Sequence, residues 1–124
     1  MKIFLDTADT EVISKYFETG LIDGVTTNPS LIMKAGRDPE VVYQEIKDIG
    51  VQDISMEVMG DAQTMLNEAL RLVDKFGSVT TVKLPCTREG LLVCKELSKV
   101  KLRTNVTLIF CAAQAVLAPK AGAS

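Results

Sequence analysis

Short β-prone apolar segments alternate with amphipathic segments along the whole chain. We expect strands at residues 2–6, 22–26, 53–58, 79–84 and 103–109. Each strand is followed by a stretch with apolar residues at helical spacing, and glycines mark several of the helix ends. This repeated strand–helix order predicts parallel strands joined by helical crossovers.

Side chains that accept hydrogen bonds from free backbone amides mark where the helices begin. The expected caps and first-turn prolines are Asp9 or Thr10, Pro29, Asp38 with Pro39, Asp61 and Thr87. The expected apolar faces are Val12, Ile13, Tyr16 and Phe17 in the first helix, Met65, Ala69, Leu72, Val73 and Phe76 after Asp61, Leu91, Leu92 and Leu97 after Thr87, and Ala112, Ala115 and Val116 in the last helix.

The two faces of each predicted strand differ in polarity. In residues 79–84, Val82 and Leu84 point to one side of the sheet, and Thr81 and Lys83 point to the other. The same alternation holds in three other strands. The apolar face carries Ile3 and Leu5 in the first strand, Ile54, Met56 and Val58 in the third, and Val106 and Leu108 in the fifth. The opposite face carries Phe4 and Asp6, then Ser55 and Glu57, and then Asn105 and Thr107. An open doubly wound sheet would be apolar on both faces, whereas a barrel carries its polar site at the carboxyl ends of the strands. The pattern favours the barrel.

The expected fold class is therefore α/β, a (β/α)8 TIM barrel of which this chain holds the first five β/α units. A complete barrel of this kind needs about 250 residues, and the chain has 124. We expect residues 1–124 to form a single domain, the truncated N-terminal part of an incomplete barrel. A native half-barrel that closes by self-association is the alternative.

Composition limits the classes of function. Hydrophobic residues make up 47% of the chain and charged residues 24%, and the net charge is −2 with a pI near 5.1. This balance offers no basic surface for nucleic acid or for an anionic membrane. No apolar segment is long enough to span a bilayer or to act as a signal peptide, so we expect a cytoplasmic protein.

The chain contains no histidine. This excludes the most common general base, the histidine-containing triads and most transition-metal sites. The three cysteines, Cys86, Cys94 and Cys111, are widely spaced and fit neither a disulfide framework nor a zinc site. We expect no metal and no cofactor, and catalysis by lysine, carboxylate, threonine or tyrosine side chains.

Lys83 is the candidate nucleophile. It lies near the end of an otherwise uncharged strand, where desolvation lowers the pKa of a lysine and frees its amine to attack a carbonyl carbon. A lysine that reaches solvent from the strand end, or one that forms an ion pair with Asp6 or Glu57, explains the same pattern. The sequence pattern alone does not decide between the nucleophile and these structural roles.

Asp6, Glu57 and Thr107 are expected on the same inward face as Lys83. Carboxylates beside a lysine can move protons to and from a carbinolamine, and a threonine can hold a water molecule. From spacing alone, salt bridges that fix the strand ends are the simpler explanation of the carboxylates. For the threonine, the simpler explanation is ordinary β-propensity.

Thr26 and Asn28 lie between the second strand and a helix. Polar side chains at a helix N-terminus can hold a hydroxyl group or an anion. From the pattern alone, an ordinary helix cap followed by Pro29 is the better interpretation.

Four pieces of the chain resemble the small transaldolase family, which includes fructose-6-phosphate aldolase. They are Phe4-Leu5-Asp6-Thr7-Ala8, Gly24-Val25-Thr26-Thr27-Asn28-Pro29-Ser30-Leu31, Val82-Lys83-Leu84-Pro85 with Thr87 and Gly90, and Ala112-Ala113-Gln114-Ala115. The pieces follow the family's order and spacing over the whole chain. The Thr-Thr-Asn-Pro-Ser motif with a fourth-strand lysine is specific, because other lysine-dependent aldolase barrels usually carry the lysine on a different strand.

The resemblance implies a role for each candidate. Lys83 matches the Schiff-base lysine, and Asp6 matches the acid/base aspartate. Glu57 and Thr107 match the pair that binds a catalytic water. The aldolase branch tends to have glutamine at the position of Glu57, which favours a transaldolase here.

Thr26 and Asn28 match residues that position the sugar hydroxyls and the Schiff base. The family's phosphate-binding residues come from later strands, so no position of this chain matches them. The implied function is transfer of a dihydroxyacetone unit between sugar phosphates in the pentose phosphate pathway, by a protein that is a homo-oligomer at full length. Fructose-6-phosphate aldolase activity and a non-catalytic truncated fragment are the alternatives.

Overall fold

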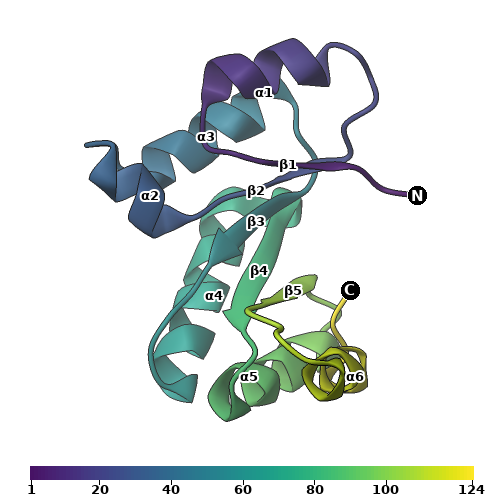
Figure 1. Ribbon diagram of the computed structural model, residues 1–124. Helices are drawn as coiled ribbons and strands as arrows, with labels where there is room; N and C mark the ends of the chain where they lie inside the picture. The colour runs from purple at the N-terminus through teal and green to yellow at the C-terminus, as the bar shows by residue number, and fades with distance from the viewer.

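A curled, five-stranded parallel sheet forms the centre of the molecule in the computed structural model, which describes residues 1–124. The strands are β1 (Phe4–Asp6), β2 (Gly24–Thr26), β3 (Ile54–Glu57), β4 (Thr80–Pro85) and β5 (Thr104–Thr107). Strands that are neighbours in the chain are also neighbours in the sheet. The sheet curls into a half-barrel, and both termini lie on its open side (Figure 1).

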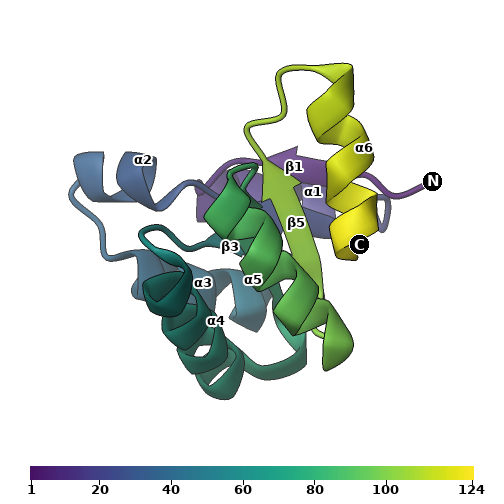
Figure 2. The ribbon, with the colours of Figure 1, turned by 90° about the horizontal axis from the view of Figure 1, so that it is seen from below.

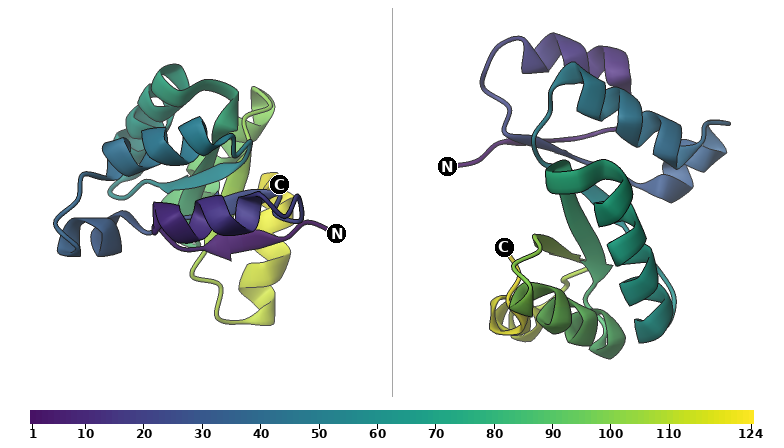
Figure 3. Two further views of the ribbon diagram at one scale, coloured as in Figure 1. Left: turned by 90° about the horizontal axis from the view of Figure 1, so that it is seen from above. Right: turned by 180° about the vertical axis from the view of Figure 1, so that it is seen from behind.

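Six helices accompany this sheet, and all except the short second helix cover its convex face (Figures 1 and 2). They are α1 (Thr10–Phe17), α2 (Pro29–Lys34), α3 (Pro39–Ile49), α4 (Ala62–Phe76), α5 (Arg88–Lys99) and α6 (Ala112–Ala121), with a 3-10 turn η1 (Gly77–Val79) before β4. The short helix α2 extends past the carboxyl end of β2 and away from the sheet (Figure 3). The expected α/β fold, a partial TIM barrel of five units, is confirmed.

The apolar core lies between the sheet and the helices. Alternate strand residues such as Ile54, Met56 and Val82 are fully buried and point toward the helices. Opposite them, α4 buries residues spaced three or four apart, which places them on one helical face. These residues are Met65, Ala69, Leu72 and Phe76. Burial of side chains of this size stabilises the fold by about 1.5–3 kcal/mol each.

The expected helix caps are present. Asp9, and not Thr10, caps α1 by accepting hydrogen bonds from two backbone amides. Asp38 caps α3 in the same way, Asp61 accepts from the Thr64 amide, and Thr87 accepts from the Gly90 amide. These bonds satisfy amides that have no partner inside the helix.

Most strands are shorter than the sequence pattern predicts, by two residues at three ends and by one residue or less elsewhere. The fifth strand ends at Thr107, because Leu108 adopts a left-handed conformation with φ of 61° and its side chain is exposed. The first and second strands begin at Phe4 and Gly24. There the Asp23 carboxylate accepts from the Ile3 amide at 2.7 Å and joins the two segments before the regular ladder starts.

The predicted apolar faces of three helices differ from the buried ones. In α1, Ile13 is buried, whereas Val12 and Tyr16 are exposed. In α5, Val93, Cys94 and Leu97 are buried, whereas Leu92 is exposed. A helix on the outside of a curled sheet touches it along a narrow line, so a residue one position away from that line faces outward. The predicted face of α6 is wrong, because Ala112, Ala115 and Val116 are all exposed; this helix packs mainly against α5, and Ala118 is its buried residue.

Gly90 lets α5 approach the end of β4 closely. A Cβ atom at this position would lie 2.0 Å from the carbonyl oxygen of Pro85. Only a residue without a side chain fits there, since real Cβ contacts are never so short. Gly90 therefore fixes where α5 sits relative to the strand that carries Lys83.

The concave face of the half-barrel is polar and open. Its floor is a hollow of about 360 Å³ lined mostly by polar residues from all five strands and the loops that precede them, with Phe4 at one side. The carboxylate of Asp53 there pairs with Arg103 at 2.9 Å and accepts from the Thr81 hydroxyl at 2.6 Å. The outer edges of β1 and β5 have no strand beside them.

None of the helices combines the length and the apolar character that crossing a membrane requires.

Candidate active site

Lys83 lies on the concave side of β4, close to its carboxyl end. Only 12% of its side chain is exposed. The Nζ atom donates a hydrogen bond to the main-chain carbonyl of Thr27 at 3.1 Å and lies 3.7 Å from a carboxylate oxygen of Glu57. Lys83 is therefore held at the end of the sheet instead of reaching out into solvent.

Glu57 is the nearest charge to Lys83. The two residues are direct partners in the register of β3 and β4, so their side chains leave the sheet side by side. The Glu57 side chain is also 12% exposed. Of the two ion pairs considered for Lys83, the structure contains the pair with Glu57, and no ion pair between Lys83 and Asp6 is formed.

Asp6 and Thr26 form a second pair beside the lysine. They are register partners in β1 and β2, and the Thr26 hydroxyl donates to the Asp6 carboxylate at 2.7 Å. Asp6 is exposed and Thr26 is partly buried. A carboxylate that is open to solvent and held by a hydroxyl group can exchange protons with a bound substrate.

Asn28 follows these strands as the cap of α2. Its side-chain oxygen accepts from the amides of Ser30 at 3.0 Å and Leu31 at 3.3 Å. The amide nitrogen makes no hydrogen bond within the protein, so it can donate to a bound hydroxyl group. The helix-cap interpretation is correct, and it leaves the donor end of the side chain available.

A small cavity brings four of the six candidates together. It has a volume of about 140 Å³ and is lined by Asp6, Thr7, Ala8, Thr26, Asn28, Leu31 and Lys83. Its walls come from the carboxyl ends of β1, β2 and β4 and from the loops that follow β1 and β2. Parallel strands of one sheet end on the same side, which is why residues distant in the chain meet here.

Thr107 is not brought into this cavity. It is the register partner of Pro85, two residues beyond Lys83, and its carbonyl accepts from the Cys86 amide at 2.8 Å. The residue beside Lys83 on β5 is Asn105, whose side chain donates to the Ser55 hydroxyl at 3.1 Å. The alternation along the strand put Asn105 on the inward face, but only the register shows that it is the neighbour of Lys83.

Burial and the charge of Glu57 both affect the pKa of Tyr43 in α3. It is 3% exposed, and its ring packs edge-on against Phe76 at 5.8 Å between centroids. Burial raises the pKa of the Tyr43 phenol, hydrogen bonding to Thr27 opposes this rise, and the negative charge of Glu57 adds to it. Tyr43 is thus close to Thr27 but is not part of the lining of the cavity.

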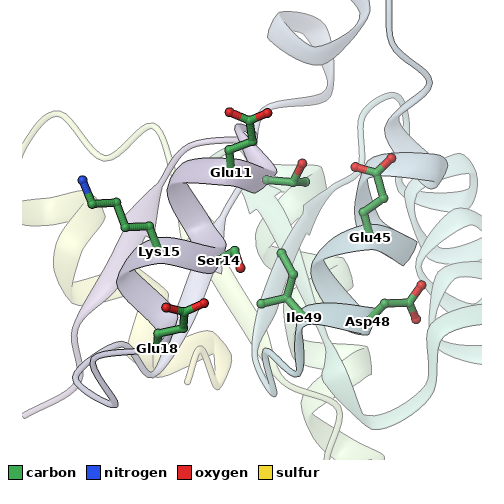
Figure 4. Close-up of a pocket in the computed structure, with 8 residues that line it drawn as sticks. Glu11, Ser14, Lys15, Glu18, Glu45, Asp48 and Ile49 are labelled. Carbon is green, nitrogen blue, oxygen red and sulfur yellow. The ribbon is translucent and has the colours of Figure 1, made fainter.

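A larger hollow lies elsewhere and contains none of the candidates. It is a groove of about 740 Å³ between α1 and α3 on the outside of the half-barrel (Figure 4). Its lining includes Glu11, Glu18, Glu45 and Asp48, with Lys15 as the one cation. The groove between α1 and α3 contains no enclosed nucleophile, so the smaller cavity at Lys83 is the better candidate for the active site.

No group of three or more cysteine, aspartate or glutamate side chains is placed to hold a metal ion.

The fold and the site together define a parallel α/β half-barrel with an enclosed lysine among carboxylate and hydroxyl groups at the carboxyl ends of its strands. Comparison with known proteins agrees with this class. The chain belongs to the Transaldolase/Fructose-6-phosphate aldolase family, which matches residues 3–124.

Several relatives carry the name "Probable transaldolase". Those of Methanococcus maripaludis strain C7, Clostridium kluyveri and Geobacter metallireducens are 53%, 51% and 51% identical to this chain over 125 residues. Each alignment covers 100% of this chain and 58% of the relative. The chain therefore spans somewhat more than half the length of the curated relatives it matches.

Proposed function

We propose that this chain supplies the nucleophilic part of a transaldolase that moves a three-carbon dihydroxyacetone unit between sugar phosphates. The reaction belongs to the pentose phosphate pathway and takes place in the cytoplasm, in a homo-oligomer at full length. The observation that carries the proposal is the enclosed position of Lys83 in one cavity with Asp6, Thr26 and Asn28. The names of the family and of the relatives support the same chemistry.

The reaction begins at the Lys83 amine. Its lone pair attacks the ketose carbonyl carbon, and loss of water from the carbinolamine gives an iminium ion. Asp6 removes the proton from the hydroxyl group of the next carbon beyond the three-carbon unit, and the carbon–carbon bond breaks as its electron pair moves into the iminium. An aldehyde leaves, and an enamine stays on Lys83.

The enamine then completes the transfer. It attacks the aldehyde carbon of a second sugar phosphate, whose oxygen takes the proton back from Asp6. Water adds to the new iminium with help from Glu57, and the product leaves as Lys83 is restored. Thr26 holds the Asp6 carboxylate in place, and Asn28 donates to a substrate hydroxyl from its unpaired amide nitrogen.

The test is chemical trapping of the iminium in the protein extended to the length of its relatives. Incubation with fructose 6-phosphate and borohydride should attach the sugar to Lys83, as located by peptide mass spectrometry. Lys83→Arg should abolish labelling. Lys47→Arg is the matched control, because the partly buried Lys47 also donates to a main-chain carbonyl, that of Phe76 at 3.0 Å. Labelling at another lysine, or none, would contradict the mechanism.

Aldol cleavage with release of free dihydroxyacetone is the second candidate, because the family name covers both activities. The two differ only in the fate of the enamine, which meets either a proton or an aldehyde. Glu57 is the residue at the site whose identity favours transfer. The ratio of free dihydroxyacetone to transferred product in the extended protein decides between the two candidates.

A further inference from the structure

Thr27 connects Lys83 to the middle of the sheet. It lies directly after β2 and is 1% exposed. Its amide and its hydroxyl group both donate to the main-chain carbonyl of Ser55 in β3, at 3.3 and 2.9 Å. Its own carbonyl accepts the hydrogen bond from Lys83 Nζ at 3.1 Å. The residue that supplies this oxygen is thus tied to one carbonyl of β3 by two hydrogen bonds.

The bond to Thr27 restricts the orientation of the Lys83 nitrogen. A neutral amine has two N–H groups and one lone pair, and only the lone pair can attack a carbonyl carbon. The Thr27 carbonyl engages one N–H group, and a carboxylate oxygen of Glu57 lies 3.7 Å from the nitrogen. The third direction on the nitrogen is then left for the lone pair. Because Lys83 lines the same cavity as Asp6 and Asn28, we infer that the lone pair points into that cavity.

We propose that Thr27 is a positioning residue for the Schiff-base reaction. Its hydroxyl group ties the residue to the Ser55 carbonyl, and its own carbonyl holds one N–H group of Lys83 so that the lone pair faces the cavity. This inference rests on the proposed function. Thr27 does not touch the substrate, and it acts through Lys83 alone.

The proton count of the reaction agrees with this role. When the lone pair forms the N–C bond, the carbonyl electrons move to oxygen, and one N–H proton moves from nitrogen to that oxygen. Protonation by a neighbouring carboxylic acid then lets the oxygen leave as water, and the iminium keeps one N–H group. The Thr27 carbonyl can hold that group from the free amine to the iminium, while the proton on the Glu57 side is the one that leaves.

The sequence also supplies a matched control. Thr80, at the start of β4, is 5% exposed, and its hydroxyl group lies 3.5 Å from the carbonyl of Leu72. Thr80→Val and Thr27→Val each remove a buried hydroxyl group with almost no change of shape. Thr80 is at the opposite end of β4 from Lys83, so its substitution reports the structural cost alone.

The experiment uses the protein extended to the length of its relatives, with fructose 6-phosphate as the probe. Thr27→Val should lower the rate of borohydride-trapped adduct on Lys83 and kcat by roughly ten- to a hundredfold, with KM changed much less, because misplacement of a reacting group reduces rate more than binding. Thr27→Ser, which keeps the hydroxyl group, should restore most of the rate. Thr80→Val should leave both rates unchanged. If Thr27→Val does not fold, Thr27→Cys is compared with Thr80→Cys, because a thiol is only a weak donor.

Equal trapping rates in the Thr27 and Thr80 variants would overturn the inference. So would a Thr27→Ser protein as slow as Thr27→Val, because the hydroxyl group would then not be the cause. In both cases the adduct still forms on Lys83, so the proposed function stands. Absence of any adduct on Lys83 in the unsubstituted protein is a separate result, and it overturns the proposed function itself.

Discussion

The contact between Lys83 and Glu57 is loose for two register partners. Their nitrogen and oxygen atoms are 3.7 Å apart, whereas a charge-assisted hydrogen bond between such groups is about 2.8 Å long. The structure thus forms the ion pair without a direct hydrogen bond between the two side chains. The acceptor oxygens of Glu57 therefore stay available to a water molecule, and binding that water is the role proposed for Glu57.

Replacement of Glu57 by glutamine should change the fate of the enamine. A carboxylate only accepts hydrogen bonds, while a glutamine amide also donates, so the same water is oriented differently. We expect Glu57→Gln in the extended protein to raise free dihydroxyacetone relative to transferred product by about fivefold, which is about 1 kcal/mol. The measurement is product analysis with fructose 6-phosphate and an acceptor aldose phosphate. Glu89→Gln, an exposed carboxylate of α5, is the control, and an unchanged ratio would place the determinant elsewhere.

The sequence predicts the members of this site better than it predicts their distances. Alternation along a strand assigns Lys83, Glu57 and Asp6 to one face, and the parallel order assigns them to one end. Alternation assigns Asn105 and Thr107 to the same inward face, but it does not give the offset between neighbouring strands, so only the register shows that Asn105 is the neighbour of Lys83. The contact of Thr27 with Lys83 is not predictable from the sequence, because it is made by a main-chain carbonyl, which every residue has.

At the level of the elements, the helix starts were predictable and the buried faces less so. A cap depends on a few adjacent residues, and Asp38, Asp61 and Thr87 act as their local sequences indicate. The buried face depends on where the sheet lies. The exposure of Leu92 and the burial of Cys94 follow from the position of α5 against β4, which is set by the close approach at Gly90.

Gly90→Ala should therefore destabilise the protein. The new methyl group would meet the Pro85 carbonyl oxygen and force α5 away from β4, at a cost of about 1–3 kcal/mol in the free energy of unfolding. Urea titration of the extended protein measures this change. Lys95→Ala, an exposed substitution on the same helix, should change stability by no more than about 0.5 kcal/mol. Equal stability of the two variants would show that the contact at Gly90 relaxes without cost.

The ion pairs of Glu40 join α3 to α4 and should make stability depend on pH. Hydrogen bonds from Arg71, and then from Lys75, hold the pKa of Glu40 below its ordinary value of 4.5. A carboxylate whose pKa is lowered by folding stabilises the protein above that ordinary value, and the contribution is lost as pH falls through the folded-state pKa. Glu40→Gln should cost about 0.5–1 kcal/mol near pH 7, since both partner cations are about half exposed and Glu40 is only partly buried.

Thermal or urea unfolding at several pH values checks this. The difference between Glu40→Gln and the unsubstituted protein should shrink as the pH is taken from 5 toward 3. Asp74→Asn, on the exposed side of α4 and without an ion pair, should show no such dependence. A difference that persists at low pH would assign the effect to packing instead of charge.

Over the whole molecule, the two unpaired strand edges and the open concave face dominate its behaviour. Free edge strands present backbone groups that pair readily with another chain. We expect the isolated 124 residues to self-associate and to transfer no sugar, because nothing within these residues covers the face that holds the cavity. Sedimentation should give masses above 13.5 kDa that rise with concentration.

The comparison is the same chain extended with the C-terminal part of the Methanococcus maripaludis relative. That protein should unfold cooperatively and show turnover in a coupled assay with fructose 6-phosphate. A monomer of the 124 residues with sharp unfolding and measurable turnover would refute the expectation.

The sheet order β1-β2-β3-β4-β5 also has a consequence for how the protein is made. Each new strand docks only on the strand that left the ribosome just before it, so the nascent chain can add one unit at a time without rearranging earlier ones. Asp6, Thr26, Glu57 and Lys83 all emerge before β5 begins. We therefore expect Lys83 to meet these neighbours early in translation, and the growing edge of the sheet is the part of the nascent chain that a chaperone would need to cover.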